Sequence, residues 1–385
     1  MARISDKKRV WGWMFFDWAT QPYYTLLLTF IFGPYFVSIV TKNLFSTGLD
    51  LESAKSQATS IWALGQTICG LMVAFLAPIL GAIADTTGRR MPWIYFFSIL
   101  YIIGSAALWW AYPDASNYWW MLLFFCIGFL GVEFASIFNS AMLPSLTSKK
   151  ETGKLSGSGY AFGYWGGVLA LALVFIFLVE QPNAVEQPKI VEQTVLVEQE
   201  GLATHTESCK KTETVKNTEL AKQVKTNKTL VGLDPILGLN PSNDKREGTR
   251  AVGPFAAIWY VIFISIFFLW VRENPQTKKS NKSLSKSLYS LLSTIKSLSN
   301  RKSLTAFLGS SLLYRDALNG LYAFGGIYAT TVLDWQITLI GIFGIIGAIT
   351  AAIFSWLGGL ADRKYGPKPV IKISMAILII VCTTI

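Results

Sequence analysis

Nine long apolar segments constrain this chain more than any other feature of its sequence. Each is about as long as the roughly 20 helical residues that cross the hydrocarbon core of a bilayer. In lipid, only helices and closed barrels satisfy their own backbone hydrogen bonds, and barrel strands are much shorter. We therefore predict an all-α polytopic membrane protein, whose spans cover approximately residues 11–40, 60–83, 92–112, 119–144, 158–179, 252–271, 304–331, 336–358 and 368–385.

The composition agrees with a membrane-embedded bundle. Of the 385 residues, 52% are hydrophobic and 15% are charged, whereas about 25% of the residues of a soluble protein are charged. Tryptophan and tyrosine gather at several segment ends, which is typical of the headgroup level of a membrane. We expect an integral membrane protein that binds the lipid bilayer and a small-molecule solute.

Lysine and arginine predict the orientation. If the N-terminus is cytoplasmic and the spans alternate, the short outer loops hold only Lys42 and Lys55. Most other basic residues then face the cytoplasm, which is the positive-inside pattern. The net charge of +11 follows from this pattern, so no nucleic acid is needed to explain it. We expect a cytoplasmic N-terminus, in a bacterial inner membrane in preference to a vacuolar membrane.

Two polar regions interrupt the apolar segments. Residues 180–251 form a long polar loop that begins with four VEQ copies at a six-residue period, starting at Val179. Few residues of this loop could pack a core, so we predict a disordered insertion. Residues 272–303 are predicted to be a cytoplasmic linker, in which leucines at helical spacing between lysines indicate a basic amphipathic helix over 280–302.

A repeated motif organises the apolar segments into two halves. "GAIADTTGRR" follows the second segment and "GGLADRKYGPK" follows the eighth, and both fall on the predicted cytoplasmic side. Six spans separate the copies, which is the offset of two six-helix halves related by a repeat. The second copy has one extra residue before its turn glycine.

With these motifs, the chain resembles transporters of the major facilitator superfamily. The resemblance implies a helical bundle with about nine of twelve expected spans: an N-terminal bundle with helices 1–5 in residues 1–179, helix 6 in 252–271, and an incomplete C-terminal bundle with helices 7–9 in 304–385, apparently truncated after the ninth. It also implies a gating role for the motif residues Gly81, Asp85, Gly88, Arg89, Arg90, Gly358, Asp362, Arg363 and Gly366.

Three further stretches resemble one family within that superfamily. "WGWMFFDWATQPYYTLLLTFIFGPYF", "FNSAMLPSL" and "LLYRDALNGLYAFGGIYAT" are similar to the vacuole effluxer-like (unknown major facilitator) family. This similarity implies export of small solutes, with amino acids as candidates because fungal members of the family are linked to them.

A few ionisable residues lie well inside the predicted spans. Asp17, Glu133, Arg315 and Asp316 would each cost a few kcal/mol if they faced lipid. Such residues usually face a cavity and pair, so we expect them to bind substrate or to carry a coupling proton. An alternative is a permanent Arg–carboxylate pair that only holds helices together. The complete set of substrate and coupling candidates is Asp17, Gln21, Glu133, Asn139, Arg315, Asp316 and Asn319.

No signature of an enzyme accompanies these charges. The four cysteines are scattered and His205 is the only histidine, so we expect neither a metal site nor a cofactor. Gly159, Gly163 and Gly167 recur every four residues and indicate close helix packing rather than a phosphate loop.

We expect a secondary active transporter, an exporter of small solutes that works by alternating access with candidate proton coupling. It should be a monomer unless a missing C-terminal half complements it. The alternative is a truncated, non-transporting remnant or a regulatory or scaffold subunit.

Overall fold

The computed structural model describes residues 5–178, 245–272, 293, 296–298 and 300–384, and all regular elements among them are helices. The predicted all-α membrane fold is confirmed. Seven helical stretches in this part of the chain are long and apolar enough to cross a membrane. Most of the predicted basic helix over 280–302 and most of the predicted loop over 180–251 lie outside the described residues.

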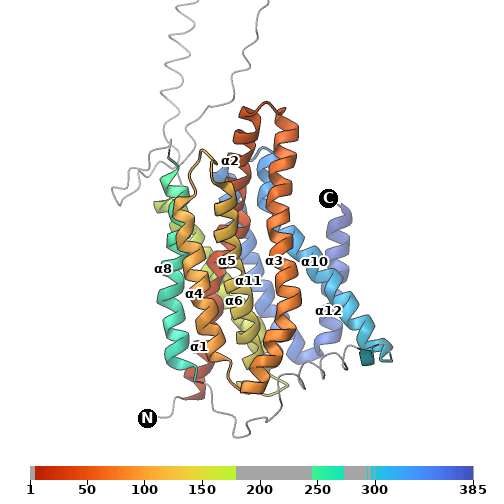
Figure 1. Cartoon of the computed structure of the whole chain (residues 1–385). Coiled ribbons are helices and arrows are strands. Elements are labelled where there is room, and N and C mark those ends of the chain that lie inside the picture. Colours follow the sequence, from red (N-terminus) through yellow and green to blue (C-terminus); the bar gives the residue numbers. More distant parts are fainter. Residues whose placement is uncertain (1–4, 179–244, 273–292, 294–295, 299, 385) are drawn as a thin grey trace, which may run out of the picture. The chain divides into compact units, whose positions relative to one another are not determined.

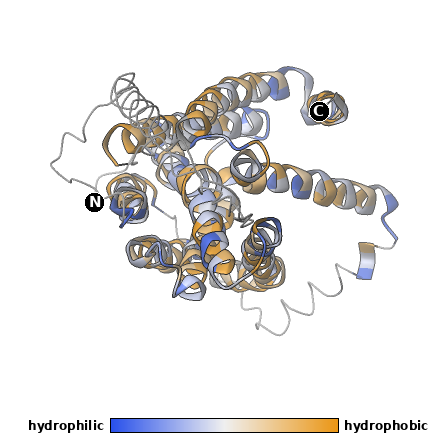
Figure 2. Cartoon of the chain, turned by 90° about the horizontal axis from the view of Figure 1, so that it is seen from above, coloured by the Kyte–Doolittle hydropathy of each residue, from blue (hydrophilic) through white to orange (hydrophobic). Residues whose placement is uncertain are grey.

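The helices run side by side, as Figure 1 shows. We call the end of the bundle at which α1 begins the N-terminal side. Helices α3, α5 and α11 end there, and α4, α6 and α12 begin there. Figure 2 shows that hydrophobic residues make up much of the length of the helices. The elements are α1 (Asp6–Pro22), η1 (Tyr23–Phe30), α2 (Phe32–Ser46), α3 (Leu51–Thr87), α4 (Met91–Ala107), η2 (Leu108–Trp110), α5 (Tyr118–Met142), η3 (Leu143–Ser145), α6 (Thr152–Phe177), α8 (Glu247–Trp270), α10 (Lys302–Thr331), α11 (Ile337–Tyr365) and α12 (Pro367–Thr384).

The first span is not one regular helix. It consists of α1, the π-helix η1 and α2, and the backbone N–H of Ile31 donates to the carbonyl of Leu26 at 3.0 Å across the end of the π turn. Pro22 lies at the junction of α1 and η1 and lacks the N–H that a regular helix needs. The apolar run over 11–40 did not predict this break, because hydropathy does not register a change of helical pitch.

Several helices extend beyond the apolar segments that predicted them. Helix α3 begins at Leu51, not at residue 60, and Asp50 caps it by accepting a hydrogen bond from the Ser53 N–H at 2.9 Å. That hydrogen bond lowers the pKa of the Asp50 carboxyl. The predicted boundaries follow hydropathy, whereas the helices continue as far as their hydrogen bonds and caps allow.

Helix α8 begins at Glu247, so the predicted boundary between loop and span at residues 251 and 252 was wrong. The helix begins before the apolar run because its first turn contains Arg250, which is 2% exposed despite its charge. Its Nε donates to the carbonyl of Trp109 at 2.8 Å, and its guanidinium lies 4.0 Å from the ring centre of Tyr112. These contacts compensate for burial of the cation and extend the helix past its apolar run.

Helices α10 and α12 are not among the seven candidate spans, although the sequence suggested nine. Helix α10 carries Lys302, Arg315 and Asp316 together with several hydroxyl residues. These polar side chains lower its mean hydropathy below that of the other long helices.

Glycines allow the tightest packing in the N-terminal half. A Cβ atom on Gly104 of α4 would overlap the backbone of Gly128 on α5, and one on Gly131 would overlap the backbone of Tyr101. Helices in lipid gain little from apolar burial alone, so close backbone approach contributes much of their association. Around this crossing lies an aromatic core in which the ring centres of Trp62 and Phe125 are 4.5 Å apart.

We predict that Gly104→Val destabilises the bundle while Gly70→Val does not. The first adds methyl groups against backbone that cannot move aside, whereas no atom lies within 4 Å of a Cβ on Gly70. Overpacking costs about 1–3 kcal/mol, so the midpoint of thermal unfolding in detergent should fall by several degrees for Gly104→Val alone. Equal midpoints for the two variants would contradict the α4–α5 contact.

Candidate functional site

Glu133 and Tyr24 form the best-defined polar contact inside the bundle. The Tyr24 hydroxyl donates to Oε1 of Glu133 at 2.9 Å, which joins η1 to α5. Tyr24 also forms a side-chain hydrogen bond with Ser136, one helical turn after Glu133. The π turn that follows Pro22 holds Tyr24 at this position, so the irregular backbone of the first span forms part of the site.

Asp17 lies in the contact between α1 and α6. A Cβ atom on Gly159 would lie 2.8 Å from Oδ2 of Asp17, and one on Gly163 would lie 3.1 Å from its Cβ. The same row continues with Gly167, whose Cβ would lie 2.8 Å from Cγ of Gln21. Close packing at these three glycines is confirmed, and it brings the α6 backbone directly against the Asp17 carboxyl group.

Tyr160 of α6 lies within electrostatic range of Asp17, Glu133 and Arg315. It is 56% exposed, so it lies beside these groups of α1, α5 and α10 and is not enclosed by them. One turn further along α6, Tyr164 forms a hydrogen bond with Tyr322 of α10. We call Asp17, Tyr24, Glu133, Tyr160 and Arg315 the central cluster.

The sequence interpretation missed both tyrosines of α6. Tyr160 and Tyr164 are four residues apart, so they share a helical face. That spacing was the available signal, but it does not say which neighbour the face meets.

The other two candidates on α10, Asp316 and Asn319, are not part of this cluster. Arg315, Asp316 and Asn319 are exposed on the helix surface. Within the part of the chain that the structure describes, no ion pair joins Arg315 to Asp316, Asp17 or Glu133. The predicted Arg–carboxylate pairs are therefore not formed in this conformation.

Asn139 lies apart from the central cluster. It is 1% exposed and its backbone carbonyl accepts a hydrogen bond from Nε1 of Trp13 at 3.0 Å. Its side-chain Oδ1 is buried without a hydrogen-bond donor among the described residues. Asn139 thus lies in the packing between α1 and α5, nearer the N-terminal side than Glu133.

The first copy of the gating motif forms the turn between α3 and α4. Gly88 ends α3 with a φ of 63°, a conformation that glycine adopts without strain. Nη1 of Arg90 donates to the carbonyl of Ala141 at 2.7 Å, while Arg89 is exposed and Gly81 faces open space. The side chain of Asp85 lies outside the described residues.

The second copy joins α11 to α6 on the N-terminal side. The Asp362 carboxyl lies directly over Gly153, where a Cβ atom would overlap it. Nε of Arg363 lies 2.9 Å from Oε1 of Glu151, and Gly366 ends α11 with a φ of 83°. The motif thereby connects a helix of the first repeat to a helix of the second.

Gly359, which the motif analysis did not select, makes a close backbone contact in this connection. A Cβ atom on Gly359 would lie 3.0 Å from the carbonyl oxygen of Gly153 and 3.1 Å from Cα of Gly157. By contrast, no atom lies within 4 Å of a Cβ on Gly358, its neighbour and a predicted motif residue. We call the contact of Gly153 and Gly157 with Gly359 the glycine seam.

We predict that Gly359→Val separates α6 from α11 while Gly358→Val leaves them together. The distance between spin labels on cysteines at Lys149 and Lys364 should lengthen in the first variant only, because only its added methyl groups meet the α6 backbone. If both variants gave the wild-type distance distribution, the glycine seam would not be holding these helix ends together.

No group of three or more histidine, cysteine, aspartate or glutamate side chains in the described ranges is arranged to hold a metal ion. The groups that lie near one another here are carboxyl, phenol and guanidinium groups. Such a set can bind a polar solute and exchange protons without a resident metal.

Comparisons with known proteins agree with this geometry. Residues 57–385 match the family described as MFS/sugar transport protein. An uncharacterized MFS-type transporter of Bacillus subtilis (strain 168), YxiO, is 28% identical over 177 residues, and the aligned region spans 45% of this chain but 39% of that relative. A solved structure of the MFS proton:xylose symporter XylE bound to 6-bromo-6-deoxy-D-glucose has a similar fold, with a TM-score of 0.53, 14% identity, and coverage of 95% of this chain and 71% of that one.

The family match extends over well more than half of the chain. That family is described as one of transport proteins, and the apolar helices agree with a multi-pass membrane location. The chain belongs to the MFS/sugar transport protein family of the major facilitator superfamily.

Proposed function

We propose that this chain forms the solute pathway of a secondary active transporter that works by alternating access. The observation that carries the proposal is the central cluster, in which Asp17, Glu133 and Arg315 lie within electrostatic range of Tyr160 and the Tyr24 hydroxyl donates to Glu133. Ionisable groups at membrane depth are costly and usually mark a substrate or ion pathway. Membership of a transporter family supports the same class of function.

The solute class that fits the cluster best is a small zwitterion such as an amino acid. A guanidinium binds a carboxylate through paired hydrogen bonds, and Arg315 is exposed and free of any ion pair in the described part of α10. Asp17 and Glu133 provide the opposite charge for an ammonium group. The similarity of three sequence stretches to the vacuole effluxer-like family adds export as the proposed direction.

A monosaccharide is the second candidate, because the matched family is described as MFS/sugar transport protein. The similar fold of a proton:xylose symporter is in line with it. Neutral hydrogen-bonding groups such as Gln21, Tyr24 and Tyr160 suit sugar hydroxyls.

We propose Glu133 and Asp17 as the groups that carry a coupling proton. A carboxyl group that is exposed alternately to the two sides of a membrane can move one proton in each cycle. Tyr24 donates to Glu133, so proton uptake at Glu133 is linked to the position of η1. In this proposal the N-terminus is cytoplasmic and the protein resides in a bacterial inner membrane.

Weak contacts at both ends of the bundle suit a cycle that opens each side in turn. On the N-terminal side Glu151 and Arg363 form an ion pair. On the opposite side Nζ of Lys55 lies 3.8 Å from Oδ1 of Asp334 and donates to the carbonyl of Thr331 at 3.3 Å. Exposed ion pairs contribute only about 0–1 kcal/mol, so neither end is held too tightly to open.

Solute counterflow in proteoliposomes tests the proposal. The full chain is reconstituted and preloaded with a mixture of unlabelled amino acids or of monosaccharides, and entry of a labelled member of each set is measured with and without a pH gradient. Exchange of amino acids alone supports the zwitterion, and exchange of sugars alone supports the second candidate. Exchange of neither would favour a non-transporting membrane protein.

We predict that Arg315→Gln abolishes solute exchange without loss of membrane insertion, because the substitution removes the cation that receives the solute carboxylate. Lys302→Gln, which removes a positive charge at the start of the same helix, should exchange solute at the wild-type rate. Full exchange by Arg315→Gln would rule out this role for Arg315.

We predict that Glu133→Gln retains counterflow but loses accumulation driven by a pH gradient, because the amide cannot carry the coupling proton. Tyr24→Phe removes one hydrogen bond to the carboxyl group, a contribution of about 1.5–3 kcal/mol when the acceptor is charged. Its proton-driven rate should therefore fall by about tenfold or more. Unchanged accumulation in both variants would exclude Glu133 as the coupling group.

A further inference from the structure

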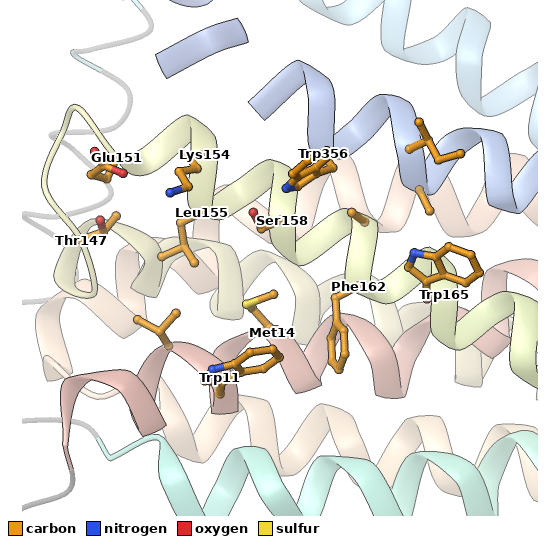
Figure 3. Close-up of a pocket in the computed structure, with 14 residues that line it drawn as sticks. Trp11, Met14, Thr147, Glu151, Lys154, Leu155, Ser158, Phe162, Trp165 and Trp356 are labelled. Atoms are coloured by element: carbon orange, nitrogen blue, oxygen red, sulfur yellow. The ribbon is translucent and has the colours of Figure 1, made fainter. Parts of the chain in front are cut away.

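A groove of about 680 Å³ lies outside the central cluster, between α1, α6 and α11 (Figure 3). Three tryptophans flank it, one from each helix: Trp11, Trp165 and Trp356. They are 49%, 47% and 50% exposed, so the groove is open along its length and not enclosed. None of the central-cluster residues lines it, which makes it a separate site.

One end of this groove carries charge. Lys154 and Glu151 line it at the start of α6, on the N-terminal side of the bundle. Glu151 is already engaged by Arg363 at 2.9 Å. Lys154 is partly buried, and its ammonium has no ion pair or hydrogen bond with any other described residue. Lys154 is the one lysine that lines the groove, and its ammonium attracts an anion to this end.

The rest of the groove is apolar. Met14, Leu155, Phe162 and Ile353 line it together with the tryptophans. Trp11 packs edge-on against Phe162, with ring centres 5.7 Å apart. A hydrophilic anion would contact Lys154 alone and would leave the apolar walls exposed. An amphiphilic anion would contact both Lys154 and the apolar walls.

The length of the groove matches one leaflet of a membrane. Lys154 is in the first turn of α6, and Trp165 follows 11 residues later. At 1.5 Å per residue, this separation is about 16 Å along the helix axis. Half of the hydrocarbon core of a bilayer is about 15 Å thick. The cation therefore lies at headgroup level while Trp165 lies near the bilayer centre.

We propose that this groove binds one anionic phospholipid, with its phosphate on Lys154 and an acyl chain along Phe162, Trp165 and Trp356. Basic pockets between transmembrane helices on the cytoplasmic side are known to hold anionic headgroups. The bound lipid contacts α1 and α6 on one wall and α11 on the other, directly beside the glycine seam. This proposal does not rest on any solute being transported.

Native mass spectrometry of the purified full chain tests the headgroup. The protein is equilibrated in detergent with equal amounts of phosphatidylglycerol and phosphatidylcholine. We expect the wild type to retain phosphatidylglycerol preferentially and Lys154→Glu to retain about tenfold less of it. The matched control Lys150→Glu makes the same charge change four residues earlier, outside the groove, and should retain the wild-type amount, as should Lys154→Arg. Equal loss in Lys150→Glu, or equal retention of phosphatidylcholine by the wild type, would overturn the proposal.

Photocrosslinking tests the place and the source of the ligand. Phosphatidylglycerol with a diazirine on one acyl chain should label peptides of α1, α6 and α11 around the groove. Ser158→Phe, which fills the lining between Leu155 and Phe162, should reduce that labelling severalfold even if Lys154→Glu proves too unstable to purify. Labelling confined to other helices, or displacement of the lipid by an equal concentration of glycerol 3-phosphate, would contradict a lipid site.

Discussion

Helix α6 touches α1 along one face and α11 along another, and glycine is what permits both contacts. Towards α1 the row of Gly159, Gly163 and Gly167 receives Asp17 and Gln21. Towards α11, Gly153 and Gly157 pack against Gly359 in the glycine seam. Gly153 also lies against the Asp362 carboxyl group. In lipid there is little hydrophobic gain from bringing two helices together, so the close fit of backbones holds them. The central cluster, the seam and the lipid groove all depend on this one helix.

The break in the first span has an equally specific effect. A regular helix would carry each residue by 100° around its axis, whereas the wider π turn after Pro22 shifts the faces that follow. This shift places Tyr24 against Glu133 and leaves Tyr23 fully buried in the aromatic core. π turns are rare and often occur at functional sites. Here the turn positions the Tyr24 hydroxyl, which donates a hydrogen bond to Glu133.

Charge is distributed by depth in this protein. At the ends of the bundle, ion pairs such as Glu151 with Arg363 are half-exposed and weak. Within the bundle, Asp17 and Glu133 meet phenol groups and glycine backbone in place of a fixed cation. Arg315 is close enough to influence Tyr160 but forms no ion pair with either carboxyl group in this conformation. Charges of both signs that form no ion pair with one another suit a ligand that brings its own charges.

The sequence by itself determined the membrane class, the approximate positions of most spans and the two motif copies. These features follow from the bilayer as a solvent. It raises the free energy of a polar group more strongly the deeper the group lies, whatever the arrangement of the neighbouring helices. Only the tertiary structure decided that Tyr24 and Tyr160 join the central cluster, that Asn139 lies apart from it, and that Gly359 and not Gly358 meets α6. The physical reason is that a helical sequence presents several faces of similar polarity. Which face meets which neighbour depends on how helices distant in sequence cross, and in the first span also on the π turn after Pro22.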